Sequence, residues 1–107
     1  MNQKKLTRLC NVSEVPQNCG IQIELPGHVE PYAVFNAGGE FYLTDDTCTH
    51  AMGSLAGGDV YEGMIICPLH GGAFDLKTGK PTEAPCEVDL KTYEIVLKGD
   101  ELFGKFD

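Results

Sequence analysis

Two cysteine–histidine pairs are the residues of this chain whose types and spacing point to chemistry. In chain order they are Cys48, His50, Cys67 and His70, with sixteen residues between the two pairs. Two thiolates and two imidazoles fit either a tetrahedral zinc ion or an iron–sulfur cluster. Pro68 stiffens the second pair, and Gly71-Gly72 behind it lets backbone amide groups approach an inorganic core closely. These neighbours favour the iron–sulfur cluster.

The pattern resembles the Rieske iron–sulfur proteins, whose motif is Cys-x-His, a gap of about fifteen to seventeen residues, and Cys-x-x-His. The run Cys-Pro-x-His-Gly-Gly-x-Phe over residues 67–74 matches the second loop of that motif. The resemblance implies one [2Fe–2S] cluster, with Cys48 and Cys67 on one iron and His50 and His70 on the other. It also implies an electron-transfer protein that is not itself an enzyme.

A structural zinc ion is the alternative for these four ligands. Zinc-binding arms usually have about two to four residues between their two ligands, and Cys48 and His50 have only one between them. The third histidine, His28, follows a Pro-Gly turn and is expected to be a surface loop residue.

Three further cysteines, Cys10, Cys19 and Cys86, remain after the four ligands are assigned. In a reducing compartment such residues are usually reduced thiols that pack as small apolar side chains. We expect all three to be dispensable for cluster binding.

Length and charge limit the remaining possibilities. The chain of 107 residues is expected to form a single domain over 1–107. Its 16 acidic and 8 basic residues give a net charge of −8, which disfavours nucleic acid and anionic membranes as partners. The sequence contains neither an apolar run of membrane-spanning length nor a secretory signal pattern, so a cytoplasmic protein is expected.

The chain is predicted to be all-β and antiparallel. Short alternating or β-branched runs are separated by turn residues, as in small sandwiches and barrels. A capped single turn is expected over 11–16, and a hairpin around Ala37-Gly38-Gly39. The predicted strands are 5–9, 20–25, 32–35, 40–44, a hairpin over 60–66, 71–75, 87–90, 93–97 and 101–106.

The Cys–His region interrupts this pattern. We expect a base domain, formed by 1–44 and 85–107, with a small cluster-binding subdomain of about 45–84 inserted into it. The resemblance to Rieske proteins implies the same arrangement.

Missing features refine the resemblance. Rieske subunits of cytochrome bc complexes carry an additional disulfide between their ligand loops, and Gly53 and Leu69 stand at those places here. Those subunits also carry a serine that donates to a cluster sulfur, where this chain has Gly72. The chain instead looks like the ferredoxins of bacterial aromatic-ring-hydroxylating dioxygenases, such as the biphenyl, benzene and carbazole systems.

That resemblance implies a monomeric carrier that takes an electron from an NADH-dependent flavin reductase and passes it to a terminal oxygenase. A small apolar rim of Met52, Leu69 and Pro85 is expected to meet both partners. Two alternatives stay open at this point. One is a Rieske subunit bound permanently to another oxidoreductase, and the other is a zinc-stabilised binding module.

Overall fold

The computed structural model describes residues 5–49, 53–68, 71–84 and 86–106, which are almost entirely strand and turn. The elements are β1 (Lys5–Asn11), η1 (Val12–Glu14), β2 (Cys19–Ile23), β3 (Tyr32–Ala37), β4 (Glu40–Asp45), η2 (Leu55–Gly57), β5 (Asp59–Tyr61), β6 (Met64–Ile66), β7 (Ala73–Asp75), β8 (Pro81–Glu83), β9 (Thr92–Tyr93), β10 (Ile95–Lys98) and β11 (Glu101–Phe106). Within these residues, no helix is long and apolar enough to cross a bilayer. The predicted all-β class is confirmed.

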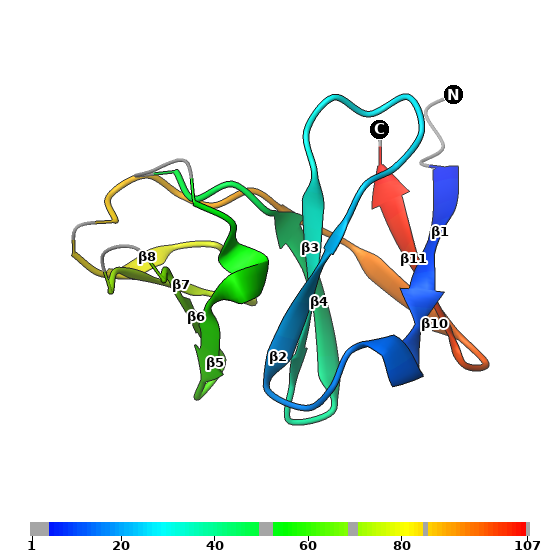
Figure 1. Cartoon of the computed structure of the whole chain (residues 1–107), viewed down its shortest axis with the longest axis horizontal. Helices are drawn as coiled ribbons and strands as arrows, with labels where there is room; N and C mark the ends of the chain where they lie inside the picture. The colour runs from blue at the N-terminus through cyan, green and yellow to red at the C-terminus, as the bar shows by residue number, and fades with distance from the viewer. Residues whose placement is uncertain (1–4, 50–52, 69–70, 85, 107) are drawn as a thin grey trace.

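The strands form three antiparallel sheets. Their orders are β1-β11-β10, β2-β3-β4-β9 and β5-β6-β7-β8. In Figure 1 the sheet of β5 to β8 lies on one side, β2 to β4 stand in the middle, and β1, β10 and β11 lie on the other side. The first and last strands of the chain pair with each other, with Lys5 opposite Phe106. The first and last described strands therefore lie in one sheet, and the Cys–His region lies between them in sequence.

The central strand β3 separates two hydrophobic cores. Its alternating side chains face opposite sides, so that Ala33 and Phe35 pack in one core and Val34 in the other. All three are fully buried, which explains why this strand is a continuous apolar run in the sequence. The core that contains Phe35 also contains Cys48, Cys67 and, from the third sheet, Val60, Ile65 and Phe74.

Tight turns join two pairs of strands as the sequence predicts. Gly38 and Gly39, between β3 and β4, have φ of +64° and +98°. Glu62 and Gly63, between β5 and β6, have φ of +50° and +78°. Positive φ at both central residues matches the right-handed twist of the strands on either side. The second of these hairpins ends at Ile66, immediately before Cys67.

The predicted strand over 87–90 is wrong. This segment is irregular, because its backbone groups form hydrogen bonds with neighbouring loops and not with a strand. The Thr49 hydroxyl donates to the Val88 carbonyl at 2.9 Å, and the Leu90 amide donates to the Gly79 carbonyl at 2.7 Å. The alternation that suggested a strand reflects the buried Cys86 and Leu90 on either side of the exposed Val88.

The single strand predicted over 93–97 is in fact two. Thr92–Tyr93 forms β9 and pairs with β4, whereas Ile95–Lys98 forms β10 and pairs with β11. The chain changes sheets at Glu94, and a local pattern of apolar residues does not mark such a change. The short strand β8 was not predicted, because it begins at Pro81, a residue that local rules place in a turn.

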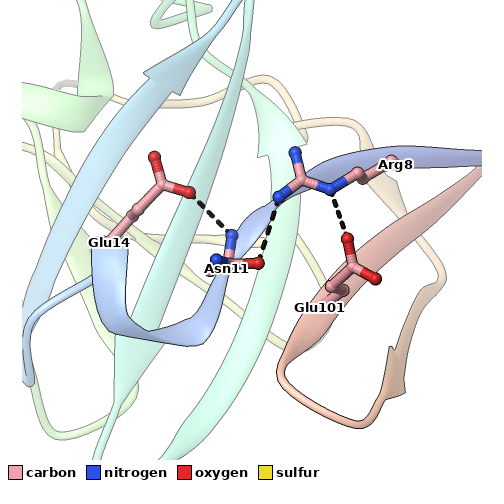
Figure 2. A network of polar contacts seen from close by, with 4 residues as sticks. All are labelled: Arg8, Asn11, Glu14 and Glu101. Carbon is pink, nitrogen blue, oxygen red and sulfur yellow. Dashed lines mark hydrogen bonds and ion pairs between the residues drawn. The ribbon is translucent and has the colours of Figure 1, made fainter.

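A polar network fastens the start of the base to its end. The expected single turn is present as η1, and at its start the backbone N–H of Asn11 donates to Glu14 Oε2 at 2.8 Å. The Arg8 guanidinium donates to Asn11 Oδ1 at 3.0 Å and to Glu101 Oε1 at 2.5 Å (Figure 2). These side chains are well exposed, and exposed ion pairs contribute about 0–1 kcal/mol. The network aligns β1 with β11 and adds little stability.

Two adjacent glycines give a matched test of packing behind the second ligand loop. A Cβ atom at Gly58 would lie 2.1 Å from the Ile66 carbonyl oxygen, whereas a Cβ at Gly57 would meet nothing within 4 Å. Gly58→Ala should therefore lower the free energy of unfolding by about 1–3 kcal/mol, the usual cost of overpacking. Gly57→Ala should be neutral or slightly stabilising. Urea denaturation followed by circular dichroism measures both, and equal stability of the two variants would contradict this packing.

Candidate metal centre

The two cysteines of the predicted ligand set lie buried in the same core. Cys48 is 3% exposed and Cys67 is 1% exposed, and both belong to the core that contains Phe35 and Phe74. The structure thus brings together two sulfurs from loops that are far apart in sequence. The two predicted histidines, His50 and His70, lie outside the described residues. The predicted rim residues, Met52, Leu69 and Pro85, lie outside them as well.

Each of these cysteines closes its loop with the same backbone hydrogen bond. The Cys48 amide donates to the Gly53 carbonyl at 2.9 Å, and the Cys67 amide donates to the Gly72 carbonyl at 2.6 Å. Both bonds join a residue to the fifth residue after it, so the two loops have the same length at their base. In the second loop the Gly71 amide also donates to the Cys67 carbonyl at 3.1 Å, with φ of +75° at Gly71. Glycine adopts that angle without strain.

The strands on either side hold the loops. The first loop follows β4, and an isolated antiparallel bridge joins Thr47 to Ser54 on either side of it. The second loop joins β6 to β7, which pair with Ile66 opposite Ala73. Each loop therefore connects two paired backbone segments, and each cysteine is the first residue after the pairing ends.

Asp46 fixes the first loop to the rest of the base. Its carboxylate accepts from Gln22 Nε2 at 2.8 Å, from the Ser54 hydroxyl at 2.9 Å and from the Ala56 amide at 2.9 Å. Its backbone amide donates to the Pro31 carbonyl, and its carbonyl accepts from the Leu55 amide. The residue is 1% exposed, so these bonds replace water around a buried charge. Sequence analysis did not single out Asp46, because its partners come from three separate segments.

A third buried cysteine, Cys86, lies beside the other two. It is 6% exposed and belongs to the same core. Burial is the main cause that raises the pKa of the Cys86 thiol to about 11, and the charge and hydrogen bond of Cys48 and the charge of Cys67 add to it. Cys86 therefore remains a protonated thiol at neutral pH. This placement could not be predicted from the sequence, since Cys86 is distant from both predicted ligand pairs along the chain.

The remaining singled-out residues lie elsewhere. Cys10 is buried in the other core, as expected, and its burial raises the pKa of its thiol to about 11. Cys19 is exposed, so the packing role expected for it is wrong. His28 is partly buried rather than on the surface, because its Nδ1 lies 2.7 Å from the Tyr32 hydroxyl and its ring packs edge-on against Phe106.

The donors that the structure describes suit a thiolate-bound inorganic cluster. Cys48 and Cys67 offer soft sulfur ligands from a dry apolar core, and each stands in a loop closed by backbone amides. Among the described residues, no group of three or more His, Cys, Asp or Glu side chains is arranged to hold a metal ion. Two of the four predicted ligands stand outside those residues.

Comparison with known proteins decides the family. The profile of the Rieske [2Fe-2S] domain family matches residues 5–94, which is most of the chain. This chain belongs to the Rieske family. The predicted family and its [2Fe–2S] cofactor are thereby confirmed.

Curated Rieske relatives match nearly the whole chain. Ferredoxin CarAc of Metapseudomonas resinovorans is 39% identical over 103 residues, covering 96% of this chain and 94% of its own length. The biphenyl dioxygenase ferredoxin subunit of Pseudomonas sp. (strain KKS102) is 38% identical over 102 residues, covering 94% and 91%. The first is named as a ferredoxin and the second as the ferredoxin subunit of a dioxygenase. This chain is accordingly an electron carrier and not a catalytic oxygenase.

Solved Rieske structures confirm the fold. A ferredoxin of Sphingomonas yanoikuyae B1 superposes with a TM-score of 0.89 at 31% identity, covering 96% of this chain and all of the other. A complex of reduced oxygenase and oxidised ferredoxin in carbazole 1,9a-dioxygenase contains a chain that superposes with a TM-score of 0.87 at 35% identity, covering 96% and 94%.

Removal of the Asp46 carboxylate tests the support of the first loop. Asp46→Ala should lower the free energy of unfolding by about 1.5–3 kcal/mol, as expected for lost hydrogen bonds to a charged group. Asp46→Asn keeps one carbonyl acceptor for Ser54 and the Ala56 amide, so its loss should be smaller. Asp59→Ala, at an exposed aspartate on β5, is the control. Equal urea midpoints for Asp46→Ala and Asp59→Ala would show that the carboxylate does not support the loop.

Proposed function

We propose that this protein is the one-electron carrier of an aromatic-ring-hydroxylating dioxygenase system. In this proposal it takes electrons from an NADH-dependent flavin reductase and passes them to a terminal oxygenase in the cytoplasm. The observation that carries the proposal is the end-to-end match to ferredoxin components, in which 94% of CarAc is covered by 96% of this chain. Such coverage leaves no room in the matched relatives for an additional catalytic domain.

We further propose that Cys48, His50, Cys67 and His70 are the cluster ligands, held in a subdomain of about 45–84. Two features of the described residues support this assignment. Cys48 and Cys67 share one buried core, and their loops close with the same five-residue backbone bond. When bound, a [2Fe–2S] cluster supplies reversible one-electron transfer. The surrounding chain contributes an apolar lining and two loops that backbone hydrogen bonds close at Cys48 and Cys67.

Charge supports a carrier that associates briefly with its partners. The net charge of −8 creates a negative field that attracts a basic face on another protein over about 8–10 Å at ordinary ionic strength. Electrostatic attraction of this kind raises the rate of encounter more than the lifetime of the complex. The protein is therefore suited to repeated meetings with two partners in turn.

Metal analysis tests the ligand set. Purified protein should contain two irons and two inorganic sulfides per chain and show the red-brown colour of a Rieske centre. Replacement of any one of Cys48, His50, Cys67 or His70 by Ala should abolish the visible absorption. Cys19→Ser, at an exposed cysteine, is the control and should keep the full iron content. Stoichiometric zinc in the wild-type protein, or full colour in one of the four variants, would contradict the assignment.

Stopped-flow mixing under anaerobic conditions tests the carrier role with the reductase and oxygenase purified from the same organism. Reductase and NADH should reduce the protein, and oxygenase should reoxidise it. Both bimolecular rates should fall as ionic strength rises, because salt screens the attraction between the acidic carrier and its partners. A carrier that is reduced but never reoxidised by the oxygenase would rule out this role, and rates independent of salt would rule out electrostatic guidance.

A further inference from the structure

Four aromatic side chains from separate parts of the chain meet at one end of the base. They are His28 from the loop before β3, Tyr32 at the start of β3, Tyr93 in β9 and Phe106 at the end of β11. In Figure 1 the loop before β3 and the end of β11 lie at the same end of the molecule. The centroid of the Tyr32 ring lies 5.3 Å, 5.3 Å and 4.8 Å from those of the other three in that order. These distances are typical of packed aromatic pairs, so the four rings form one continuous aromatic wall.

Polar contacts hold two of these rings in place. The Tyr93 hydroxyl donates to Asp45 Oδ1 at 2.6 Å, and the Tyr32 hydroxyl lies 2.7 Å from Nδ1 of His28. Only Phe106 is fully enclosed, at 7% exposed, whereas the other three rings are half-buried. The wall therefore has a fixed orientation and keeps part of its surface open to solvent.

A hollow of about 290 Å³ lies beside this wall, between β9 and β11. It is lined by the four rings together with Lys91, Thr92, Glu94 and Lys105. Sites for small molecules usually have volumes of about 300–1,000 Å³, so this hollow lies at the lower end of that range. Its size suits a molecule built on a single ring.

The charges around the hollow differ from those of the rest of the chain. Two ammonium groups and one carboxylate line it, so its local charge is positive in a chain of net charge −8. Lys91 Nζ lies 5.5 Å from the centroid of the Tyr93 ring, and Lys105 Nζ lies 3.3 Å from Glu94 Oε2. An ammonium group has three N–H donors, so Lys105 can donate to Glu94 and to a bound anion together.

A neighbouring hollow shows the opposite charge. It has a volume of about 430 Å³ and shares His28 with the first, but Glu24 and Glu30 line it and no lysine does. Two carboxylates without an ammonium group repel an anion. Of these two adjacent hollows, only the one beside the aromatic wall combines rings with positive charge.

We propose that the hollow between β9 and β11 binds a small aromatic carboxylate, a single planar ring that carries one anionic group. The ring would pack against the aromatic wall, and the carboxylate would accept charge-assisted hydrogen bonds from Lys91 and Lys105. A neutral ring would gain nothing from the two ammonium groups, and an anion without a ring would leave the wall in water. The site contains none of the proposed cluster ligands, so this inference does not rest on the proposed function.

Titration of the purified full-length protein with sodium benzoate tests the proposal, with ¹H–¹⁵N correlation spectra as the readout. Benzoate should shift the amide signals of Thr92, Tyr93 and Phe106 saturably. We expect a dissociation constant of about 1 mM, a value that ligands of about nine non-hydrogen atoms can reach. Cyclohexanecarboxylate, which keeps the charge without the aromatic ring, and benzyl alcohol, which keeps the ring without the charge, should each bind at least about threefold more weakly.

Lysine variants separate this site from general attraction of an anion to positive charge. Lys91→Gln and Lys105→Gln should each raise the dissociation constant for benzoate about threefold, the effect expected of one partly exposed ionic contact. Lys98→Gln is the matched control, because Lys98 Nζ also lies over an aromatic ring, 5.7 Å from the Phe103 centroid, but does not line the hollow. Its dissociation constant should equal that of the wild type.

Four results would overturn the proposal. The first is the absence of saturable shifts at Thr92, Tyr93 and Phe106 up to benzoate concentrations of about ten times the expected dissociation constant. The second is an equal effect of Lys91→Gln, Lys105→Gln and Lys98→Gln, which would show unspecific attraction. The third is binding of benzyl alcohol or cyclohexanecarboxylate as tight as that of benzoate. The fourth is a set of shifts confined to the neighbouring hollow around Glu24 and Glu30.

Discussion

The buried carboxylate of Asp46 is the interaction on which the arrangement of the metal centre depends. It joins β2, through Gln22, to the turn that carries Ser54 and Ala56, and it stands two residues before Cys48. A carboxylate in an apolar interior is costly unless several donors surround it, and here each oxygen has at least one. Because its backbone also bonds to Pro31 and Leu55, a shift of the first loop would break contacts in the base. These bonds thus hold the first loop in place against the sheet.

The two cores explain how the third sheet, β5-β6-β7-β8, is supported by the rest of the molecule. β3 places Phe35 in one core and Val34 in the other, so this one strand separates the two cores. Gly20 on β2 lies against Phe35 so closely that a Cβ atom there would be 2.4 Å from its ring. Packing of this density transmits displacement rather than absorbing it. The sulfurs of Cys48 and Cys67 are therefore held by the whole molecule and not by their loops alone.

Features that depend on residues close together in the sequence could be predicted from it. Spacing predicted the two ligand pairs, which remain a proposal, and the glycines at 38–39 and 63 located two hairpins. Long-range relationships were not predictable. Alternation at 87–90 suggested a strand, but the bonds of this segment go to Thr49 and Gly79. The positions of Asp46 and Cys86 depend on partners that are adjacent only after folding, and a single aspartate or cysteine gives no sign of such partners in one sequence.

The two ligand loops combine equal closure with unequal ligand spacing. Both close from the cysteine amide to the carbonyl five residues later, although His50 follows its cysteine by two residues and His70 by three. The two cysteines therefore have the same closing backbone hydrogen bond, while the two histidines occupy different sequence positions within loops of the same length. The features that the two loops share therefore lie at their cysteine ends, where each loop is closed by a backbone hydrogen bond and each cysteine is buried in one core. Cys86 is buried in the same core.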